Sequence, residues 1–257
     1  GILTQAAEAA VIPAGAIQFV DSSDRQAVTD LIKMNGLVDV VIPRGGAGLI
    51  QAVVQNATVP VIETGIGVCH TYVDAGADYD MARAIAINAK VQRPAVCNAM
   101  ETLLVHEDAA AEFLPQMLTE YFAAGVTIIG CGKTQAFDKR IQAATEADWA
   151  TEYGDLRLSV KIVSGLEEAL AHIAKYGTKH SECIVTSDYN HARTFQQRVD
   201  AAAVYVNAST RFTDGFEFGF GAEIGISTQK LHARGPMALP ELTSSKYLIS
   251  GDGQIRG

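Results

Sequence analysis

Cys97 is the residue of this sequence best suited to nucleophilic chemistry. It lies in the segment 93–102, between a helix-like apolar stretch over residues 78–92 and a strand-like run over residues 102–106. Pro94 cannot continue a helix, so the chain has to turn there and present Cys97 on a short connection. A thiol that packed elements hold on a loop can attack a carbonyl carbon. A single cysteine is more often a small buried apolar residue than a catalyst, so the flanking sequence has to decide.

Gly45 and Gly46 mark a second segment that could bind a ligand. A β-branched run over residues 38–42 predicts a strand, residues 43–48 predict a glycine turn, and residues 49–56 predict a helix. A strand, a turn and a helix in this order point backbone N–H groups and a helix N-terminus at a phosphate. The spacing is not G-x-G-x-x-G, so on spacing alone a plain tight turn fits equally well.

His70 offers a different chemistry. A Cys97–His70 pair would make a thiol hydrolase, in which the imidazole removes the thiol proton. No third residue that would orient the imidazole stands out, and a histidine within a strand is more often a hydrogen-bonded packing residue. We keep the hydrolase as an alternative hypothesis.

Strands and helices alternate along the chain, which predicts an α/β fold. Residues 211–225 are rich in glycine and phenylalanine without a clear period, and predict a long ordered loop of the kind that lines a site. Besides the segments named above, the patterns predict strands over residues 16–20, 59–62, 70–73, 183–186, 203–206 and 245–249, and helices over residues 3–10, 108–124, 164–176 and 188–199.

The composition excludes several classes of protein. The chain has 257 residues, of which 48% are hydrophobic and 19% charged, so it is large and apolar enough for a sizeable core. A net charge of -9 argues against a nucleic-acid surface, and no apolar run is long enough to span a membrane. The first residues do not read as a secretion signal. Four widely spaced cysteines suit neither a disulfide framework nor a metal site, so we expect a cytoplasmic protein without a metal.

Five segments together resemble the γ-glutamyl phosphate reductase family, which belongs to the aldehyde dehydrogenase superfamily. The resemblance covers essentially the whole chain. It is carried by residues 93–106 (RPAVCNAMETLLVH), 41–46 (VIPRGG), 69–74 (CHTYVD), 216–228 (FEFGFGAEIGIST) and 229–239 (QKLHARGPMAL).

This resemblance implies a Cys97-dependent reduction. L-Glutamyl 5-phosphate would be reduced with NADPH to L-glutamate 5-semialdehyde, with loss of phosphate, as a step of proline biosynthesis. The Cys97 thiolate would displace phosphate and form a thioester, which keeps the carbonyl carbon electrophilic enough to accept a hydride. Because a free cysteine has a pKa of about 8.5, we expect the site to lower the pKa of Cys97 through a helix terminus or a nearby cation.

The resemblance also implies roles for cofactor residues. Gly45, Gly46 and Ala47 match the turn that faces the cofactor pyrophosphate, and Glu152 matches the carboxylate that holds the nicotinamide ribose. The alternative is that Glu152 is an ordinary solvent-exposed acid on a loop without a role in binding. Glu63 falls where hydrolytic relatives keep a water-activating base, which a reductase does not need, so we expect it only near the site.

The substrate would be a small molecule with a carboxylate. Arg93, Arg211 and Arg234 are candidates to bind that carboxylate, because a planar guanidinium suits it, although each would be equally ordinary in a salt bridge. Asn98 and Asn207 are candidates for stabilising the oxyanion, with the backbone N–H of Cys97.

The implied architecture has three parts. Residues 1–65 would be the second half of a doubly wound NADP-binding domain, residues 66–228 an α/β catalytic domain, and residues 229–257 a C-terminal segment with an oligomerisation strand that joins a partner in a homo-oligomer. Family members begin upstream of Gly1, and a sheet without its first βαβ unit would expose apolar faces. A second hypothesis is therefore a truncated, cofactor-deficient homologue that acts only as a binding or interaction remnant.

Overall fold

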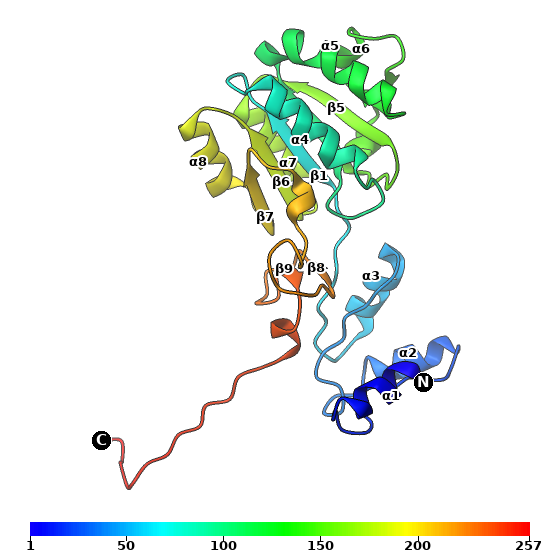
Figure 1. Cartoon of the computed structure of the whole chain (residues 1–257), viewed down its shortest axis with the longest axis vertical. Coiled ribbons are helices and arrows are strands. Elements are labelled where there is room, and N and C mark those ends of the chain that lie inside the picture. The colour runs from blue at the N-terminus through cyan, green and yellow to red at the C-terminus, as the bar shows by residue number, and fades with distance from the viewer.

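A seven-stranded parallel sheet forms the upper part of the structure in Figure 1, a computed structural model that describes the backbone of all 257 residues and every side chain except that of Ala47. The strand order is β4-β3-β5-β2-β1-β6-β7, so β1 and β2 are central neighbours. The strands are β1 (Cys69–Val73), β2 (Met100–His106), β3 (Thr127–Gly130), β4 (Gln142–Ala143), β5 (Arg157–Val163), β6 (Ser181–Val185) and β7 (Ala203–Val206).

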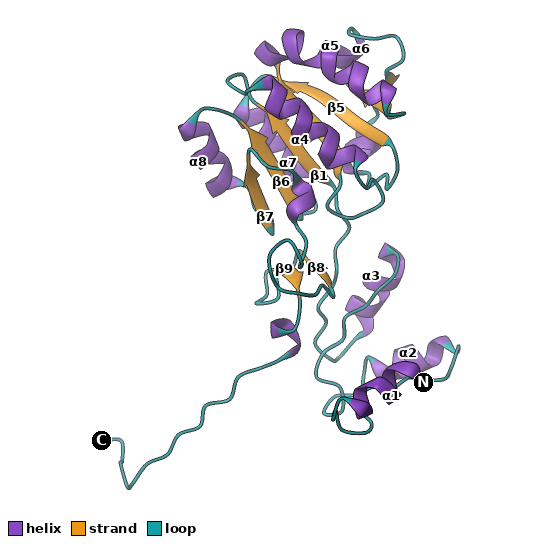
Figure 2. Ribbon diagram, viewed as in Figure 1, coloured by secondary structure: helices purple, strands orange, loops and turns teal.

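Helices cover both faces of this sheet (Figure 2). On one face, α4 (Tyr79–Val91) and α5 (Glu107–Ala123) pack against β-strand side chains such as Leu103. On the other face, α7 (Leu166–Tyr176) and α8 (Tyr189–Arg198) pack against side chains that include Leu104 and Tyr72. Burying one side chain of this size stabilises the fold by about 1.5–3 kcal/mol, and parallel strands covered on both faces read as continuous apolar runs.

Helix α4, which precedes the turn to β2, is fixed at both of its ends. The Asp78 side chain accepts the N–H of Met81 at 3.0 Å and so caps the start of α4. Near the other end, Lys90 is fully buried and its Nζ lies 2.5 Å from Oε2 of Glu101 on β2. Removing one partner of such a buried ion pair leaves an uncompensated charge, so the pair ties α4 to β2 on either side of the turn at residues 93–98.

The remaining elements lie outside the sheet (Figure 1). A two-stranded antiparallel pair, β8 (Gly225–Ser227) and β9 (Gly235–Met237), lies between the sheet and the terminal segments. The N-terminal helices are α1 (Ile2–Ala9), α2 (Arg25–Leu31) and α3 (Ala47–Asn56). The short elements are α6 (Gly132–Gln135) and the 3₁₀ helices η1 (Glu146–Ala150), η2 (Thr210–Phe212) and η3 (Pro240–Leu242).

The strand predictions place four of the seven strands of the sheet and miss β3, β4 and β5, and those for segments outside the sheet fail. The helices and strands expected between residues 70 and 206 form within a few residues of their expected positions, and the helices expected over residues 3–10 and 49–56 form as α1 and α3. The strands predicted over residues 16–20, 38–42, 59–62 and 245–249 are wrong, except that Val38 and Val41 form isolated parallel bridges, with Asn35 and Val61 respectively. A strand needs a neighbour with which to pair its backbone groups, and these segments have none in the described chain beyond those two bridges.

Large apolar side chains are exposed in both terminal segments, as expected for residues 1–65. Val11 is 91% exposed and Phe19 is 87% exposed, and the extended C-terminal tail leaves Tyr247, Leu248 and Ile249 exposed. Across the described residues, no helix combines the length and the hydropathy needed to cross a membrane.

Candidate active site

Cys97 lies on a tight turn at the amino end of β2. The N–H of Ala99 donates to the carbonyl oxygen of Val96 at 2.9 Å, which closes the turn around Cys97. Cys97 is a partly exposed free thiol, whereas Cys69 and Cys183 are fully buried. The sheet therefore offers one thiol to a ligand at its amino edge, next to the start of β1.

The backbone of Cys97 rests on the residues that lead into β1. The Cys69 Sγ donates to the carbonyl oxygen of Cys97 at 3.2 Å. A Cβ atom at Gly67 would lie only 1.5 Å from the same oxygen, so only glycine fits at this position. Gly67 is not among the predicted site residues, although its place in Gly65-Ile66-Gly67 directly before a strand is typical of a close backbone approach.

Cys97 opens onto a cleft of about 680 Å³. This cleft brings together seven of the predicted site residues, namely Gly45, Gly46, Arg93, Cys97, Asn98, Glu152 and Arg211. Six charged side chains line it, and none of the six forms an ion pair with another described side chain: Arg44, Arg93, Arg211, Glu152, Asp214 and Glu223. Unpaired charges of both signs around one cavity are suited to a ligand that itself carries both signs.

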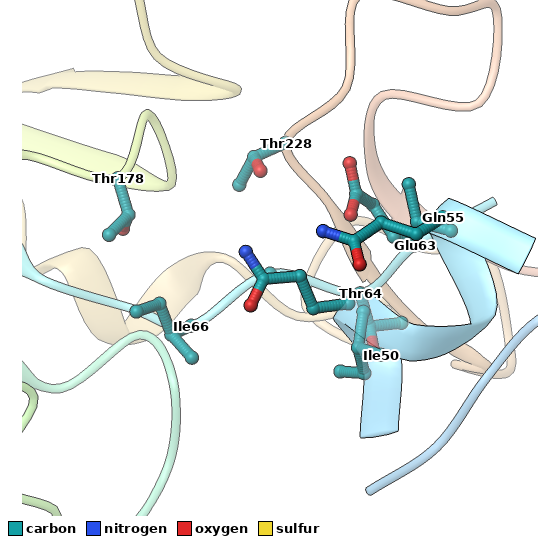
Figure 3. A pocket seen from close by; sticks show the side chains of 10 residues that line it. Ile50, Gln55, Glu63, Thr64, Ile66, Thr178 and Thr228 are labelled. Atoms are coloured by element: carbon teal, nitrogen blue, oxygen red, sulfur yellow. The ribbon is translucent and has the colours of Figure 1, made fainter. Parts of the chain in front are cut away.

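A second pocket of about 450 Å³ adjoins this cleft through Thr64, Gly65 and Ile66, which line both. Figure 3 shows Glu63, Thr64 and Gln55 on one side of it and Thr178 on the other. Glu63 lines this adjoining pocket and not the cleft that holds Cys97. This position agrees with the expectation that Glu63 is a neighbour of the site.

The glycine turn opens α3 toward the cleft. Gly46 is the N-cap of α3, and no side chain caps the free N–H groups of the first turn. A Cβ atom at Gly46 would meet nothing within 4 Å, so the backbone there is open to a ligand. The backbone of Ala47 begins the helix, while its side chain lies outside the described residues.

A backbone hydrogen bond holds Glu152 in the cleft that contains Cys97. Its Oε1 accepts the N–H of Gly67 at 2.8 Å, which leaves Oε2 free of any described protein partner. The following loop is fixed in turn, because Oε1 of Glu101 accepts the N–H of Gly154 at 3.2 Å. The buried Lys90–Glu101 pair thereby positions Glu152 as well as the turn that carries Cys97.

Asn98 is a structural clamp and its amide is not free to stabilise an oxyanion. Its Nδ2 donates to the carbonyl oxygen of Thr213 at 2.8 Å and to that of Arg211 at 3.4 Å. The Thr210 hydroxyl donates to the carbonyl oxygen of Asn98 at 2.7 Å. These bonds fix η2, which carries Arg211, against the turn that carries Cys97.

Asn207 does not line the cleft, contrary to its predicted role. It has a left-handed backbone, with φ of 55°, at the end of β7. Its Oδ1 accepts the N–H of Thr186 and its Nδ2 donates to the carbonyl oxygen of Thr186, both at 2.9 Å. The side chain is therefore used to join the ends of β6 and β7.

Asn207→Ala should lower the free energy of unfolding by about 1–3 kcal/mol, because it removes two hydrogen bonds and places a Cβ-bearing residue without polar help in the left-handed region. The ligand affinity and turnover of the remaining folded protein should change less than about twofold. Urea unfolding and steady-state kinetics would check both. A large change in KM without a loss of stability would mean that Asn207 binds the ligand and that the structural role is wrong.

Two other predicted partners are also engaged elsewhere. Arg234 pairs with Asp200 at 2.9 Å, away from the cleft. His70 is fully buried, and both its Nδ1 and its backbone N–H lie within 2.9 Å of Oε2 of Glu182. The imidazole is thus a packing residue, and the geometry contradicts a Cys97–His70 catalytic pair.

The pKa of Cys97 is raised to about 11, so the expected lowering is wrong for this chain. Burial is the largest cause, and the negative charges of Glu223 and Glu152 add to it, while Arg44 lowers the pKa only in part. The pKa of Cys131, in contrast, is lowered overall, because hydrogen bonds from Thr134 and from backbone N–H groups outweigh burial.

Alkylation should distinguish these two thiols. Since the thiolate reacts, the rate at Cys97 should rise about tenfold per pH unit from about pH 7 to about pH 10 without levelling off, and Cys131 should react first near neutrality. Pulses of iodoacetamide followed by peptide mass spectrometry would measure both rates, with the buried Cys183 as an unreactive internal control. A plateau of the Cys97 rate below about pH 9 would contradict the raised pKa.

Comparisons with known proteins agree on one family. Residues 2–128 match the Aldehyde dehydrogenase family. The chain is 64% identical over 255 residues to a γ-glutamyl phosphate reductase of Moorella thermoacetica and 61% identical to one of Clostridium acetobutylicum, covering 99% of this chain and 61% of each relative. The chain therefore spans about three fifths of the length of these curated relatives.

Solved structures show the same relationship. The crystal structure of γ-glutamyl phosphate reductase from Thermotoga maritima matches with a TM-score of 0.95 and 51% identity, over 99% of this chain and 62% of that one. An acetylating aldehyde dehydrogenase from Geobacillus thermoglucosidasius matches with a TM-score of 0.64 and 21% identity, over 82% of this chain and 55% of that one, and so shares the fold. The predicted α/β, aldehyde-dehydrogenase-like fold is confirmed.

Proposed function

We propose that this chain is a member of the aldehyde dehydrogenase family and forms the catalytic part of a γ-glutamyl phosphate reductase. The proposed reaction is the NADPH-dependent reduction of L-glutamyl 5-phosphate to L-glutamate 5-semialdehyde and phosphate. The observation that carries the proposal is the position of Cys97, a partly exposed thiol on a rigid turn that faces the glycine turn of α3 across one cleft. That arrangement places a nucleophile and a phosphate-binding backbone around the same cavity.

The residues of the cleft fit a nicotinamide dinucleotide. The uncapped N–H groups at the start of α3 suit a pyrophosphate, since Gly45 and Gly46 line the cleft and no atom lies within 4 Å of a Cβ position at Gly46. The free Oε2 of Glu152 can accept a hydrogen bond from a ribose hydroxyl. When bound there, NADPH would supply the hydride that reduces the acyl group.

Cys97 would carry the acyl group through the reaction. Its sulfur attacks the acyl carbon of the substrate, a C–S bond forms, and the C–O bond to phosphate breaks, so phosphate leaves and a thioester remains. Because the raised pKa keeps Cys97 a thiol in the resting chain, the thiol proton has to leave as the attack proceeds, and the departing phosphate oxygen accepts it, so that hydrogen phosphate is released. After reduction of the thioester carbon, breakage of the C–S bond releases the aldehyde and regenerates the sulfur nucleophile.

The other properties of the complete protein are proposals of the same kind. We divide the chain at about residues 65 and 228, as expected from the sequence, and we propose a homo-oligomer in the cytoplasm. Three consecutive apolar residues of the tail, Tyr247, Leu248 and Ile249, are 90%, 84% and 92% exposed, which supports pairing of this segment with a second copy.

The test is turnover by the full-length protein in the reverse direction, from the semialdehyde to the acyl phosphate. Glutamate 5-semialdehyde should drive reduction of NADP⁺ only when phosphate is present, because phosphate has to release the acyl group from Cys97. Release of the free acid without a nicotinamide would favour the thiol hydrolase. Neither activity in a folded protein would favour the binding-only remnant.

A further inference from the structure

A smaller hollow of about 200 Å³ opens beside the Cys97 cleft. Arg211 and Asp214 line both cavities, so the hollow is a side chamber of the cleft and not a separate site. Its other lining residues are Asn88 and Gln92 at the end of α4, with Phe212 and Glu217. Neither Asp214 nor this chamber is singled out by the sequence motifs.

Arg211 presents an uncommitted guanidinium to this chamber. The side chain is half-buried, and its Nε donates to Oε1 of Gln92 at 2.9 Å, which fixes the plane of the group. The two terminal nitrogens have no described protein partner. Burial and the neighbouring charge of Arg93 lower the pKa of Arg211, so an anion bound there would relieve an unfavourable environment.

Asp214 presents the opposite charge from the same loop. It is half-buried, and its Oδ1 accepts the N–H groups of Phe216 and Glu217 at 2.8 and 3.2 Å. Its Oδ2 has no partner among the described residues, and Arg211 and Asp214 do not pair with each other. The loop therefore holds a fixed carboxylate and a fixed guanidinium side by side, each with free hydrogen-bonding capacity toward the cavity.

Both charges are held at a set position relative to Cys97. The Asn98 clamp joins the two segments, with the Thr210 hydroxyl on the Asn98 carbonyl oxygen and Nδ2 of Asn98 on the Thr213 carbonyl oxygen. Asn98, Thr210 and Thr213 are buried, so water does not compete with these bonds. A substrate that spans the two charges and the sulfur would be oriented before it reacts.

We propose that Arg211 and Asp214 bind the α-carboxylate and the α-ammonium of an amino-acid substrate whose side-chain acyl carbon reaches Cys97. This inference rests on the proposed reductase function and adds its specificity-determining residues. The guanidinium accepts a carboxylate in a planar, two-bond geometry, and the free oxygen of Asp214 accepts an ammonium hydrogen. Acyl compounds without the ammonium group would leave Asp214 unpaired in the chamber and would be discriminated against.

The experiment compares two aldehydes on the full-length protein in phosphate with NADP⁺. One is glutamate 5-semialdehyde and the other is 5-oxopentanoate, which has the same chain and carboxylate but no ammonium group. Asp214→Asn should lower kcat/KM for the first about 30-fold and for the second less than about threefold, since only the first loses a charged hydrogen bond. Cyclisation of the amino aldehyde is the same for every variant and cancels from the comparison between variants.

Two further variants complete the test. Arg211→Gln should lower kcat/KM for both aldehydes about 30-fold or more, mainly through KM, because both carry the carboxylate. Glu112→Gln removes one exposed negative charge on α5, outside the cleft. This variant should change kcat/KM for either aldehyde by less than about twofold. If Asp214→Asn lowers kcat/KM for both aldehydes by the same factor while the wild type is active, the assignment of Asp214 to the ammonium group is wrong and the reductase function stands. If the wild type acts on neither aldehyde, the proposed function fails and the inference fails with it.

Discussion

Cys97→Ser should lower the turnover of the full-length protein by about 10⁴-fold or more, because a nucleophile acts as part of a unit whose loss removes most of the chemical acceleration. A hydroxyl has a far higher pKa than a thiol and does not form an exchangeable thioester. Phosphate-dependent reduction of NADP⁺ in the presence of glutamate 5-semialdehyde would measure the loss. The fold should remain intact, because Cys97 is partly exposed and a serine adds no volume.

Cys131→Ser is the matched control for this experiment. Cys131 is also a partly exposed free thiol, and its pKa is lowered, so it is the more reactive thiol near neutral pH. It lies outside the cleft, and its replacement should change turnover less than about twofold. If Cys97→Ser kept more than about one tenth of the wild-type rate, a covalent role for this sulfur would be untenable.

Gly67→Ala should lower kcat about 100-fold, since displacing a reacting group by about 1 Å can have an effect of that size. The added Cβ would lie 1.5 Å from the Cys97 carbonyl oxygen and 2.4 Å from its carbonyl carbon, both backbone atoms that no rotamer change can move away. The turn that carries the nucleophile therefore has to shift, and the hydrogen bond from Cys69 to that oxygen has to lengthen or break. Steady-state kinetics and thermal unfolding would separate lost activity from lost stability.

Gly76→Ala provides the comparison. A Cβ at Gly76 meets no atom within 4 Å, and the turn that contains it follows β1 at the opposite end of that strand from Gly67. This variant should retain activity within about twofold of the wild type. Equal behaviour of the two alanine variants would mean that the turn at Cys97 tolerates displacement, and the argument from close packing would be refuted.

The side chamber changes the view of how the cleft selects its substrate. The three arginines and three acids around the cleft do not neutralise one another through ion pairs within the described chain. Three of these six groups, Glu152, Arg211 and Asp214, are half-buried, and such a charge without a partner carries a desolvation cost that a ligand with complementary charges offsets. The charge pattern therefore belongs to ligand recognition, while the buried Lys90–Glu101 pair serves to hold the frame.

Much of the architecture follows from patterns that are local in the chain. The alternation of β-branched runs with amphipathic stretches was enough to place β1, β2, β6 and β7 and the helices between them, because each period reflects which face of an element is buried. Pro94 located the end of α4, and the position of Cys97 on a turn follows from it. The glycine turn before α3 was also visible, since glycine before a helix start has a local conformational reason.

The partners of individual side chains could not be inferred in this way. Asn98 is bonded to Thr213, His70 to Glu182 and Glu152 to Gly67, across separations of 115, 112 and 85 residues. Asn207 and His70 have the residue types of a site, yet the fold uses one to join two strands and buries the other on a carboxylate. The raised pKa of Cys97 has the same origin, because burial and the charges of Glu223 and Glu152 arise only when distant segments meet.

Local order along the chain therefore determined the turn that carries Cys97, the glycine turn and the α/β alternation, since each depends on neighbouring residues and on which face is buried. The packing of segments far apart in the chain settled which charges surround the sulfur, which polar side chains are already engaged, and why position 67 has to be glycine. These properties depend on distances through space, and no periodicity in the sequence encodes such distances.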